Sequence, residues 1–540
     1  MTAPPTQVGV RAEVRTPSSQ KRAPSLSMNV RHAAAWSMGS TILFKILGIT
    51  ATAIVARILS RQDFGAFAVA TTVFTIVSAL GGSGLTTSIT RADFRVGDIA
   101  PTMWTFSLGT NVLVAAALVL FARPIAAGLG APNGAAPIRV MAIVTILDGL
   151  SAVPTAQLVR DFKQSKIFLA GLISFIPSTT VLIFLAKSGD GAMAFAWSRV
   201  VGTAIVCIVI LISVPKRYMP GISRSGLSVL YHFGIPFTLA TLVGYVLQNV
   251  DYALVGRLMG PLILGTYVVA FNAASWSSSL LAGALGAVAV SAFSRVMHDR
   301  ERLMDAITDG VRIVVLIAAP MAALEMVLSR PLVLTLYGPH WAAASEPLAI
   351  LTLYGLISIV CLLFSQMLAA LGQSKFILIV QVLWLVALAP AMALGVHADG
   401  IVGAASAHVF VIVPIVLPCY LIALKRATGV RVSALVKVSL PALVAAAMAG
   451  AIAWLLMQSF RSPVVQLFVG GAAGTLFYLA ATAPQLIIVI GRRKIRHPAV
   501  LGFLRIYYHA GRSLGLRMGP PPRHARRIGR RHIRDYRKYT

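Results

Sequence analysis

Long apolar stretches recur along nearly the whole chain, and they constrain the fold more than any other feature. A transmembrane helix needs about 20 mostly apolar residues, and fourteen such stretches can be marked in the sequence. They cover residues 36–56, 66–90, 101–121, 136–157, 166–186, 192–214, 231–257, 262–290, 310–329, 344–370, 376–396, 401–424, 434–457 and 464–490. Short polar segments join them, and none shows the alternation typical of barrel strands, so they predict helices.

Composition and charge distribution favour the same class of protein. Hydrophobic residues make up 57% and charged residues 12% of the chain, which excludes an ordinary soluble domain. With the N-terminus inside, the inner loops and the N-terminal tail carry 22 lysines and arginines, while the outer joints carry seven. Cytoplasmic loops are the positive ones. We therefore expect a multi-pass membrane protein with cytoplasmic N- and C-termini.

An internal repeat indicates duplicated halves. The segment Ile49–Ala70 matches Asn249–Ala270 at an offset of 200 residues without a gap. The identical pairs are Val55 and Val255, Arg57 and Arg257, Gly65 and Gly265, Val69 and Val269, and Ala70 and Ala270. Six helices per half give both copies the same orientation, as in parallel-repeat transporters. We predict an all-α polytopic membrane protein of about 14 transmembrane helices, with two parallel-repeat six-helix lobes and an appended helix pair. Chance similarity between apolar stretches is the alternative.

The expected domain organisation follows from the repeat and from the polar segments. It comprises a basic, disordered cytoplasmic tail (1–35), an N-lobe (36–214), a cytoplasmic inter-lobe linker (215–230), a C-lobe (231–424), an appended pair (425–490) and a polybasic cytoplasmic tail (491–540). Residues 492–540 carry 15 basic groups against one acid, Asp535. Such a stretch is attracted to anionic lipids. We expect membrane binding by this tail and not nucleic-acid binding, with an acidic partner protein or polymer as the alternative.

Ionisable side chains inside the predicted spans are the candidate functional residues, because charges at this depth are costly and usually face a cavity or one another. Lys45 lies in the first span and Arg199 in the sixth. We expect both to present positive charge to a central cavity where an anionic headgroup binds. The alternative is ion pairing of Lys45 with Asp148 and of Arg199 with Asp251, which would order the bundle.

Other charged positions have narrower expected roles. Asp148 and Asp251 are candidate proton or sodium sites of a coupled transporter. Arg57 and Arg257 end equivalent helices, where they either line the outer mouth and contact substrate or snorkel to the interface. Glu325 is placed near the outer end of the ninth span, from where its side chain could reach the headgroups, and we expect His408 to be a packed or hydrogen-bonded histidine.

Catalytic machinery is not expected. The longest outer joint, Ala122–Ala135, offers no paired carboxylates, metal pattern or nucleophile with a base. The sequence also has no phosphate-cradling glycine-rich loop with a lysine. These observations favour a transporter over an enzyme, with no cofactor and no metal. A membrane-embedded glycan polymerase or ligase and a non-transporting scaffold remain alternatives.

The joint after the first span resembles a known family. Ala56–Ala68 has the pattern Ala-Arg-x-Leu-x-x-x-Asp-Phe-Gly, and Gly84, Leu85 and Arg91 close the next span. This is similar to the Wzx-type polysaccharide transporters, the oligosaccharide flippases of the multidrug/oligosaccharidyl-lipid/polysaccharide exporter superfamily. The resemblance covers roughly residues 36–425.

The resemblance implies a function in the bacterial plasma (inner) membrane. Such proteins move undecaprenyl-pyrophosphate-linked oligosaccharide from the inner to the outer leaflet for surface polysaccharide biosynthesis, by alternating access. Lipid-linked oligosaccharide is then the expected substrate, and Lys45, Arg199, Arg57 and Arg257 are the expected substrate-binding residues. Other polysaccharide-assembly proteins are possible partners. A lipid II flippase and a cation-coupled multidrug exporter of the same superfamily are the alternatives.

Overall fold

The computed structural model describes residues 39, 43–90, 96–161, 163–214, 218–294, 296 and 299–492. The N-terminal tail predicted at 1–35, nearly all of the polybasic tail at 491–540 and its expected binding to anionic lipids lie outside these residues. Within the described ranges the regular secondary structure is helical, without strands, as the apolar spans predicted.

Helices in the first half follow one another with short joints. They are Leu43–Ala56, α2 (Arg61–Thr90), α3 (Val96–Gly128), the 3-10 helix η1 (Pro132–Gly134), α4 (Ala135–Arg160), α5 (Gln164–Ser188), α6 (Ala192–Ser213) and α7 (Arg224–Val229). The rest of the described chain comprises the π-helix η2 (Leu230–Gly234), α8 (Ile235–Ser294), α9 (Arg300–Val327), α10 (Ser329–Leu336), the 3-10 helix η3 (Pro339–Ala344), α11 (Ser345–Ala370), α12 (Ser374–Val411), the π-helix η4 (Ile412–Val416), α13 (Leu417–Thr428), α14 (Val432–Met457) and α15 (Pro463–Arg492).

Eleven helical segments of the described chain are long and apolar enough to cross a membrane. Two of them contain a break in the helical backbone, at Gly260 in α8 and at Asp399 and Gly400 in α12. Each break falls where the sequence predicts a joint between two spans, so each of these segments crosses twice. Together with the shorter apolar helix Leu43–Ala56, the segments match the fourteen predicted spans.

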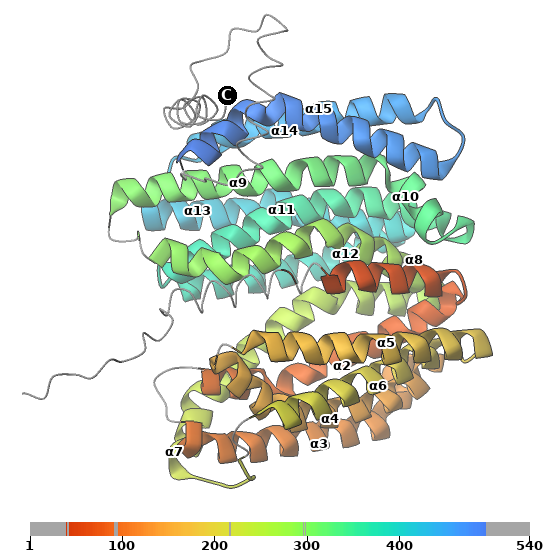
Figure 1. Ribbon diagram of the computed structural model, residues 1–540, viewed down its shortest axis with the longest axis vertical. Helices are drawn as coiled ribbons and strands as arrows, with labels where there is room; N and C mark the ends of the chain where they lie inside the picture. Colours follow the sequence, from red (N-terminus) through yellow and green to blue (C-terminus); the bar gives the residue numbers. More distant parts are fainter. Residues whose placement is uncertain are drawn as a thin grey trace, which may run out of the picture.

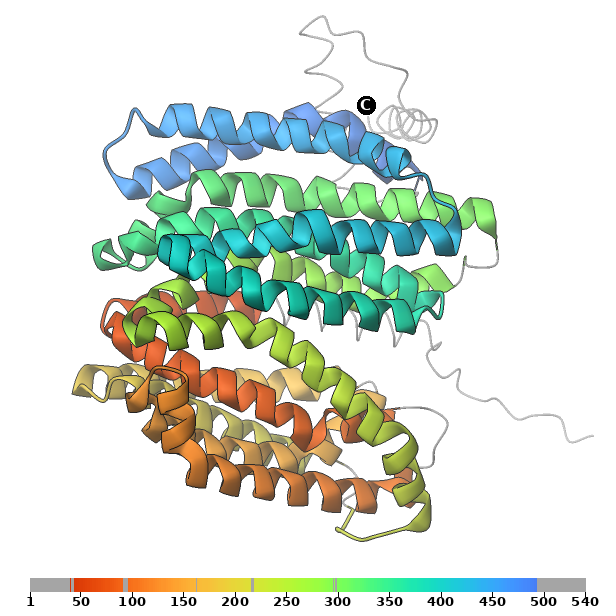
Figure 2. The ribbon, with the colours of Figure 1, turned by 180° about the vertical axis from the view of Figure 1, so that it is seen from behind.

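The helices form two groups, which Figure 1 shows one above the other. The lower group contains α2 to α7, and the upper group contains α9 to α13 with α14 and α15 at its edge. Helix α8 lies where the groups meet and packs against α2 (Figure 2). Toward the end of the bundle that carries η3 the groups lie close together, and they diverge toward the opposite end (Figure 2). We call the first end, where Arg57, Gly128 and Gly338 lie, the Arg57 end.

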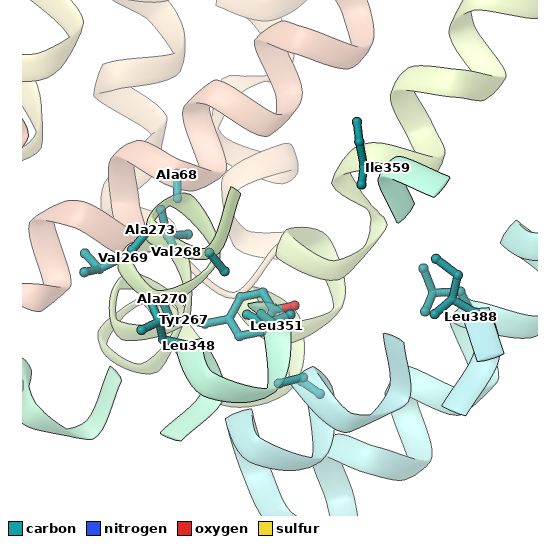
Figure 3. Close-up of a cluster of buried hydrophobic side chains, with 14 of the residues drawn as sticks. Ala68, Tyr267, Val268, Val269, Ala270, Ala273, Leu348, Leu351, Ile359 and Leu388 are labelled. Atoms are coloured by element: carbon teal, nitrogen blue, oxygen red, sulfur yellow. The ribbon is translucent and has the colours of Figure 1, made fainter. Parts of the chain in front are cut away.

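Small side chains allow α2 and α8 to approach each other closely. Ala68 of α2 lies beside the buried residues Tyr267–Ala270 and Ala273 of α8 (Figure 3). An ideal Cβ added to Gly65 would lie 1.8 Å from the Pro261 carbonyl oxygen, and one added to Gly265 would lie 1.9 Å from the Arg61 carbonyl oxygen. Small residues at helix crossings are how membrane helices gain close packing. At the contact between the halves, Gly65 of α2 therefore packs against the backbone of α8, and Gly265 of α8 packs against the backbone of α2.

Candidate functional site

Arg199 of α6 faces the neighbouring helices of the first half. Its guanidinium carbon lies 6.0 Å from the ring centroid of Phe74 in α2, within the range of a cation–π contact. The Arg199 guanidinium interacts electrostatically with the carboxyl group of Asp148 in α4. The two side chains form no ion pair within 4.0 Å in the described part of the chain. The sequence alternative of a pair between Arg199 and Asp251 is not what the structure has.

Lys45, on the helix Leu43–Ala56, interacts with an acid of the other half. The interaction is with Glu325 of α9, and not with Asp148. Ser277 of α8 donates a hydrogen bond of 3.0 Å to Glu325 Oε2, while Glu325 Oε1 is buried without a partner. Glu325 is therefore held between helices, and the interpretation that it could reach the headgroups is wrong. Lys45 itself forms no ion pair within 4.0 Å among the residues that the structure describes.

Asp251 of α8 lies in a buried polar cluster of the second half and is 1% exposed. The Tyr267 hydroxyl donates a hydrogen bond of 3.3 Å to Asp251 Oδ2. His408 Nε2 lies 3.2 Å from the Tyr267 hydroxyl and 3.7 Å from Asp251 Oδ2. His408 is thus hydrogen-bonded, as expected, but its acidic neighbour was not predicted.

A cavity of about 210 Å³ adjoins this cluster. Its polar lining residues come from α8, α11 and α12 and are Gln248, Asp251, Ser275, Ser278, Tyr354, Ser358 and His408. Asp251 Oδ1 and His408 Nδ1 are buried without hydrogen-bond partners, which is costly unless another group meets them. The cluster therefore has unused hydrogen-bonding capacity beside a space that can hold small polar species.

The two arginines of the repeat reach across to helix ends of the opposite half. Arg57 donates to the carbonyl oxygens of Thr335 and Leu336, 3.2 Å for the bond to Leu336, at the end of α10. Arg257 donates to the Gly128 carbonyl oxygen at 3.3 Å, at the end of α3. Cations are favourable at helix C-termini, where carbonyl groups lack partners. Both arginines thus connect the halves at the Arg57 end, a contact that the sequence did not predict.

Sequence reasoning missed several of these partners. Phe74, Ser277 and Tyr267 carry no charge, so a search for ionisable residues at membrane depth does not single them out. Tyr267 could have been noticed through the repeat, because it aligns with Phe67 and adds a hydroxyl there. The electrostatic influence of Glu325 on Lys45, 280 residues away in the sequence, depends on how the halves dock, which the sequence pattern does not encode.

Two helical lobes with charged side chains at membrane depth define a polytopic membrane transporter. The family model described as polysaccharide biosynthesis protein matches residues 54–346, more than half of the chain. The chain belongs to this family, in agreement with the resemblance found in the sequence.

Individual relatives agree with this assignment. The succinoglycan biosynthesis transport protein ExoT of Rhizobium meliloti (strain 1021) is 27% identical over 433 residues, covering 79% of this chain and 87% of its own length. The lipopolysaccharide biosynthesis protein WzxC of Escherichia coli (strain K12) is 23% identical over 327 residues, covering 60% of this chain and 66% of its own.

Solved structures share the fold at low sequence identity. The lipid II flippase MurJ in an inward closed conformation matches with a TM-score of 0.68 at 16% identity, covering 84% of this chain and 98% of that one. An inward-facing multidrug-resistance transporter of the MATE family matches with a TM-score of 0.58 at 15% identity, covering 73% and 99%. The likeness shows that this chain shares the two-lobe helical fold of these structures.

Proposed function

We propose that this protein flips polyprenyl-pyrophosphate-linked oligosaccharide from the inner to the outer leaflet of the bacterial plasma membrane, for surface polysaccharide biosynthesis. The observation that carries the proposal is a pair of cations at membrane depth, Lys45 and Arg199, neither of which forms an ion pair within 4.0 Å in the described residues. A pyrophosphate cannot enter hydrocarbon unpaired, because burying its charge costs too much. Lysine and arginine are the side chains that neutralise it and hydrogen-bond to it.

Transport in this proposal proceeds by alternating access of the two halves. Both termini are cytoplasmic, so the Arg57 end faces outward. Arg57 and Arg257 hold this end closed through the opposite half's carbonyl groups, and bind the pyrophosphate once the halves separate there. Asp148 and Asp251 are the candidates for the coupling ion. The polybasic tail binds anionic lipids and offers a docking site for other polysaccharide-assembly proteins.

The first test is extraction of polyprenyl-linked glycans from cells lacking the protein, followed by mass spectrometry. We expect one lipid-linked oligosaccharide to accumulate, with loss of its surface polymer. Complementation then tests the site: Lys45→Ala and Arg199→Gln should fail to restore the polymer at normal protein level, while Lys45→Arg should restore it because the charge is kept. Full activity of both neutral variants would remove the two cations from substrate binding.

A lipid II flippase or a cation-coupled multidrug exporter is the second candidate. The acids at depth, Asp148, Asp251 and Glu325, are the observation that favours an exporter, because a cationic substrate needs negative charge. Altered sensitivity to cationic drugs without accumulation of a glycan would support the exporter. Accumulation of lipid II alone would support the peptidoglycan precursor as the substrate.

A further inference from the structure

Asp251, Tyr267 and His408 are joined by two hydrogen bonds, and Asp251 Oδ1 and His408 Nδ1 are buried without partners. We propose that these three residues form a proton relay and a single proton-binding site, which couples the transport proposed above to a proton gradient. The inference rests on the proposed function for its role in transport, but the binding of the proton is a property of the cluster itself.

The geometry allows both hydrogen bonds of the cluster to point in either direction. With Asp251 ionised, His408 Nε2–H donates to the Tyr267 oxygen over 3.2 Å, and the Tyr267 hydroxyl donates to Asp251 Oδ2 over 3.3 Å. With Asp251 protonated, the carboxyl O–H donates to Tyr267, and the Tyr267 hydroxyl donates to the Nε2 lone pair of His408. The two states differ by one proton and need no movement of heavy atoms.

Proton transfer between the two states balances along the chain of atoms. A proton binds the free Nδ1 of His408, the Nε2 proton passes to the Tyr267 oxygen, and the Tyr267 proton passes to Asp251 Oδ2. His408 is neutral in both states and differs between them only in its tautomer. The unpartnered Nδ1 is what this relay requires at its entrance.

The cavity beside the cluster provides the path to water. Its volume of about 210 Å³ exceeds that of one water, about 30 Å³ in the liquid. Gln248, Ser275, Ser278 and Ser358 line it with groups that can hydrogen-bond to water. Protons can therefore reach His408 through ordered water molecules, although the cluster itself is enclosed.

The surroundings of Asp251 favour a proton over a metal cation. The ionisable groups around it are Tyr252 and Tyr267 of α8, Tyr354 of α11 and His408 of α12, with Cys361 of α11 next to Tyr354. Hard cations prefer a shell of several oxygens, whereas here a ring nitrogen covers one side of the carboxylate. In the described residues no lysine or arginine lies within 4.0 Å of Asp251, so a proton is the counter-charge that neutralises it.

The position of the cluster links proton binding to movement of the halves. Asp251 lies before the break at Gly260 in α8 and Tyr267 lies after it, so the cluster joins the two segments of this helix. The same helix packs against α2 of the opposite half. Ionising a buried carboxyl changes how strongly these segments hold together, because an unpaired charge in low dielectric is costly.

Two measurements on the purified full-length protein test the proposal. The first is an infrared pH titration without any substrate, in which wild type should show the carbonyl band of a buried protonated carboxyl and Asp251→Asn should lack its major component. The second uses proteoliposomes and a fluorescent polyprenyl-pyrophosphate disaccharide as the probe. A pH gradient should accelerate flipping several-fold over no gradient, and an equal sodium gradient should not.

Variants of the relay should abolish this acceleration, so that flipping is equally fast with and without the pH gradient. We expect this for Asp251→Asn, His408→Gln and Tyr267→Phe, whereas His397→Gln, an exposed histidine on α12, should keep it. Unchanged acceleration in Asp251→Asn, or acceleration by sodium alone, would overturn the proton site while leaving the flippase function intact. If wild type flips no probe, the proposed function fails, and the infrared band alone decides whether Asp251 binds a proton. If Asp251→Asn does not fold, His408→Gln and Tyr267→Phe decide the matter.

Discussion

Replacing the repeat glycines with alanine should force the halves apart at the Arg57 end. A Cβ at Gly65 would lie 1.8 Å from the Pro261 carbonyl oxygen and one at Gly265 would lie 1.9 Å from the Arg61 carbonyl oxygen, whereas real Cβ atoms almost never come within 3.0 Å. Each substitution therefore demands a backbone shift of about 1 Å or more. The obstructing atoms are main-chain atoms, so no side chain can rotate away to relieve the contact.

The magnitude follows from overpacking, which typically costs about 1–3 kcal/mol. This cost applies only while the halves touch at this end, because separated helices no longer oppose the new methyl group. A difference of that size between two conformations changes their ratio roughly 5- to 150-fold. We therefore expect Gly65→Ala and Gly265→Ala to shift the protein toward the conformation that is open at the Arg57 end.

Distances between two spin labels, measured by double electron–electron resonance, provide the assay. Spin labels at Lys187→Cys, in the last turn of α5, and at Ala398→Cys, beside the break in α12, report the separation of the halves, since both positions are exposed at the Arg57 end. The native Cys207, Cys361 and Cys419 are first replaced.

The matched control is Gly244→Ala, also in α8, where an added Cβ would meet nothing within 4 Å. The two repeat variants should populate longer distances than the control. Identical distance distributions in all three variants would refute the close contact as a determinant of conformation.

Three further substitutions test other contacts. Arg57→Gln and Arg257→Gln should shift the same distances in the same direction, because each removes a cation from the helix end of the opposite half, at about 1 kcal/mol each. Because the two contacts are separate, their effects should add in the double variant, and unchanged distances in the double variant would show that these contacts do not hold the end closed. Tyr478→Phe removes the 2.8 Å hydrogen bond to the Leu316 carbonyl oxygen, which joins α15 to α9. It should lower stability by about 0.5–1.5 kcal/mol, seen as a lower Tm in detergent, and an unchanged Tm would mean that the appended helices are held by apolar packing alone.

The architecture could be predicted from the sequence because membrane insertion depends on local properties. Spans of sufficient length, and joints such as those at Gly260 and Gly400, are visible as interruptions of hydropathy. The repeat of Arg57 and Arg257 also exposed the duplication, since the two copies align without a gap.

The partners of the charged residues could not be predicted in the same way. Depth along a span suggested pairs such as Lys45 with Asp148, but rotation about each helix axis decides which side chains meet. In the structure the acid that acts electrostatically on Lys45 is Glu325, and Asp251 contacts His408; these partners lie 280 and 157 residues away in the sequence. The repeat shows that Arg57 and Arg257 are equivalent, but it does not predict their hydrogen-bond acceptors. These are main-chain carbonyl groups, which every residue has.

The duplicated halves are alike where they touch and different where they carry charge. Gly65 and Gly265 are identical because both helices must approach closely at the contact. The positions aligned with Asp251 and Tyr267 are Ala51 and Phe67, so the first half lacks both the carboxyl group and the hydroxyl group of the proposed relay. A proton can therefore bind in this manner in only one half. On this proposal the cluster contributes one proton per transport cycle, and grafting Asp alone at Ala51 does not rebuild the relay, because Phe67 has no hydroxyl group to pass a proton on.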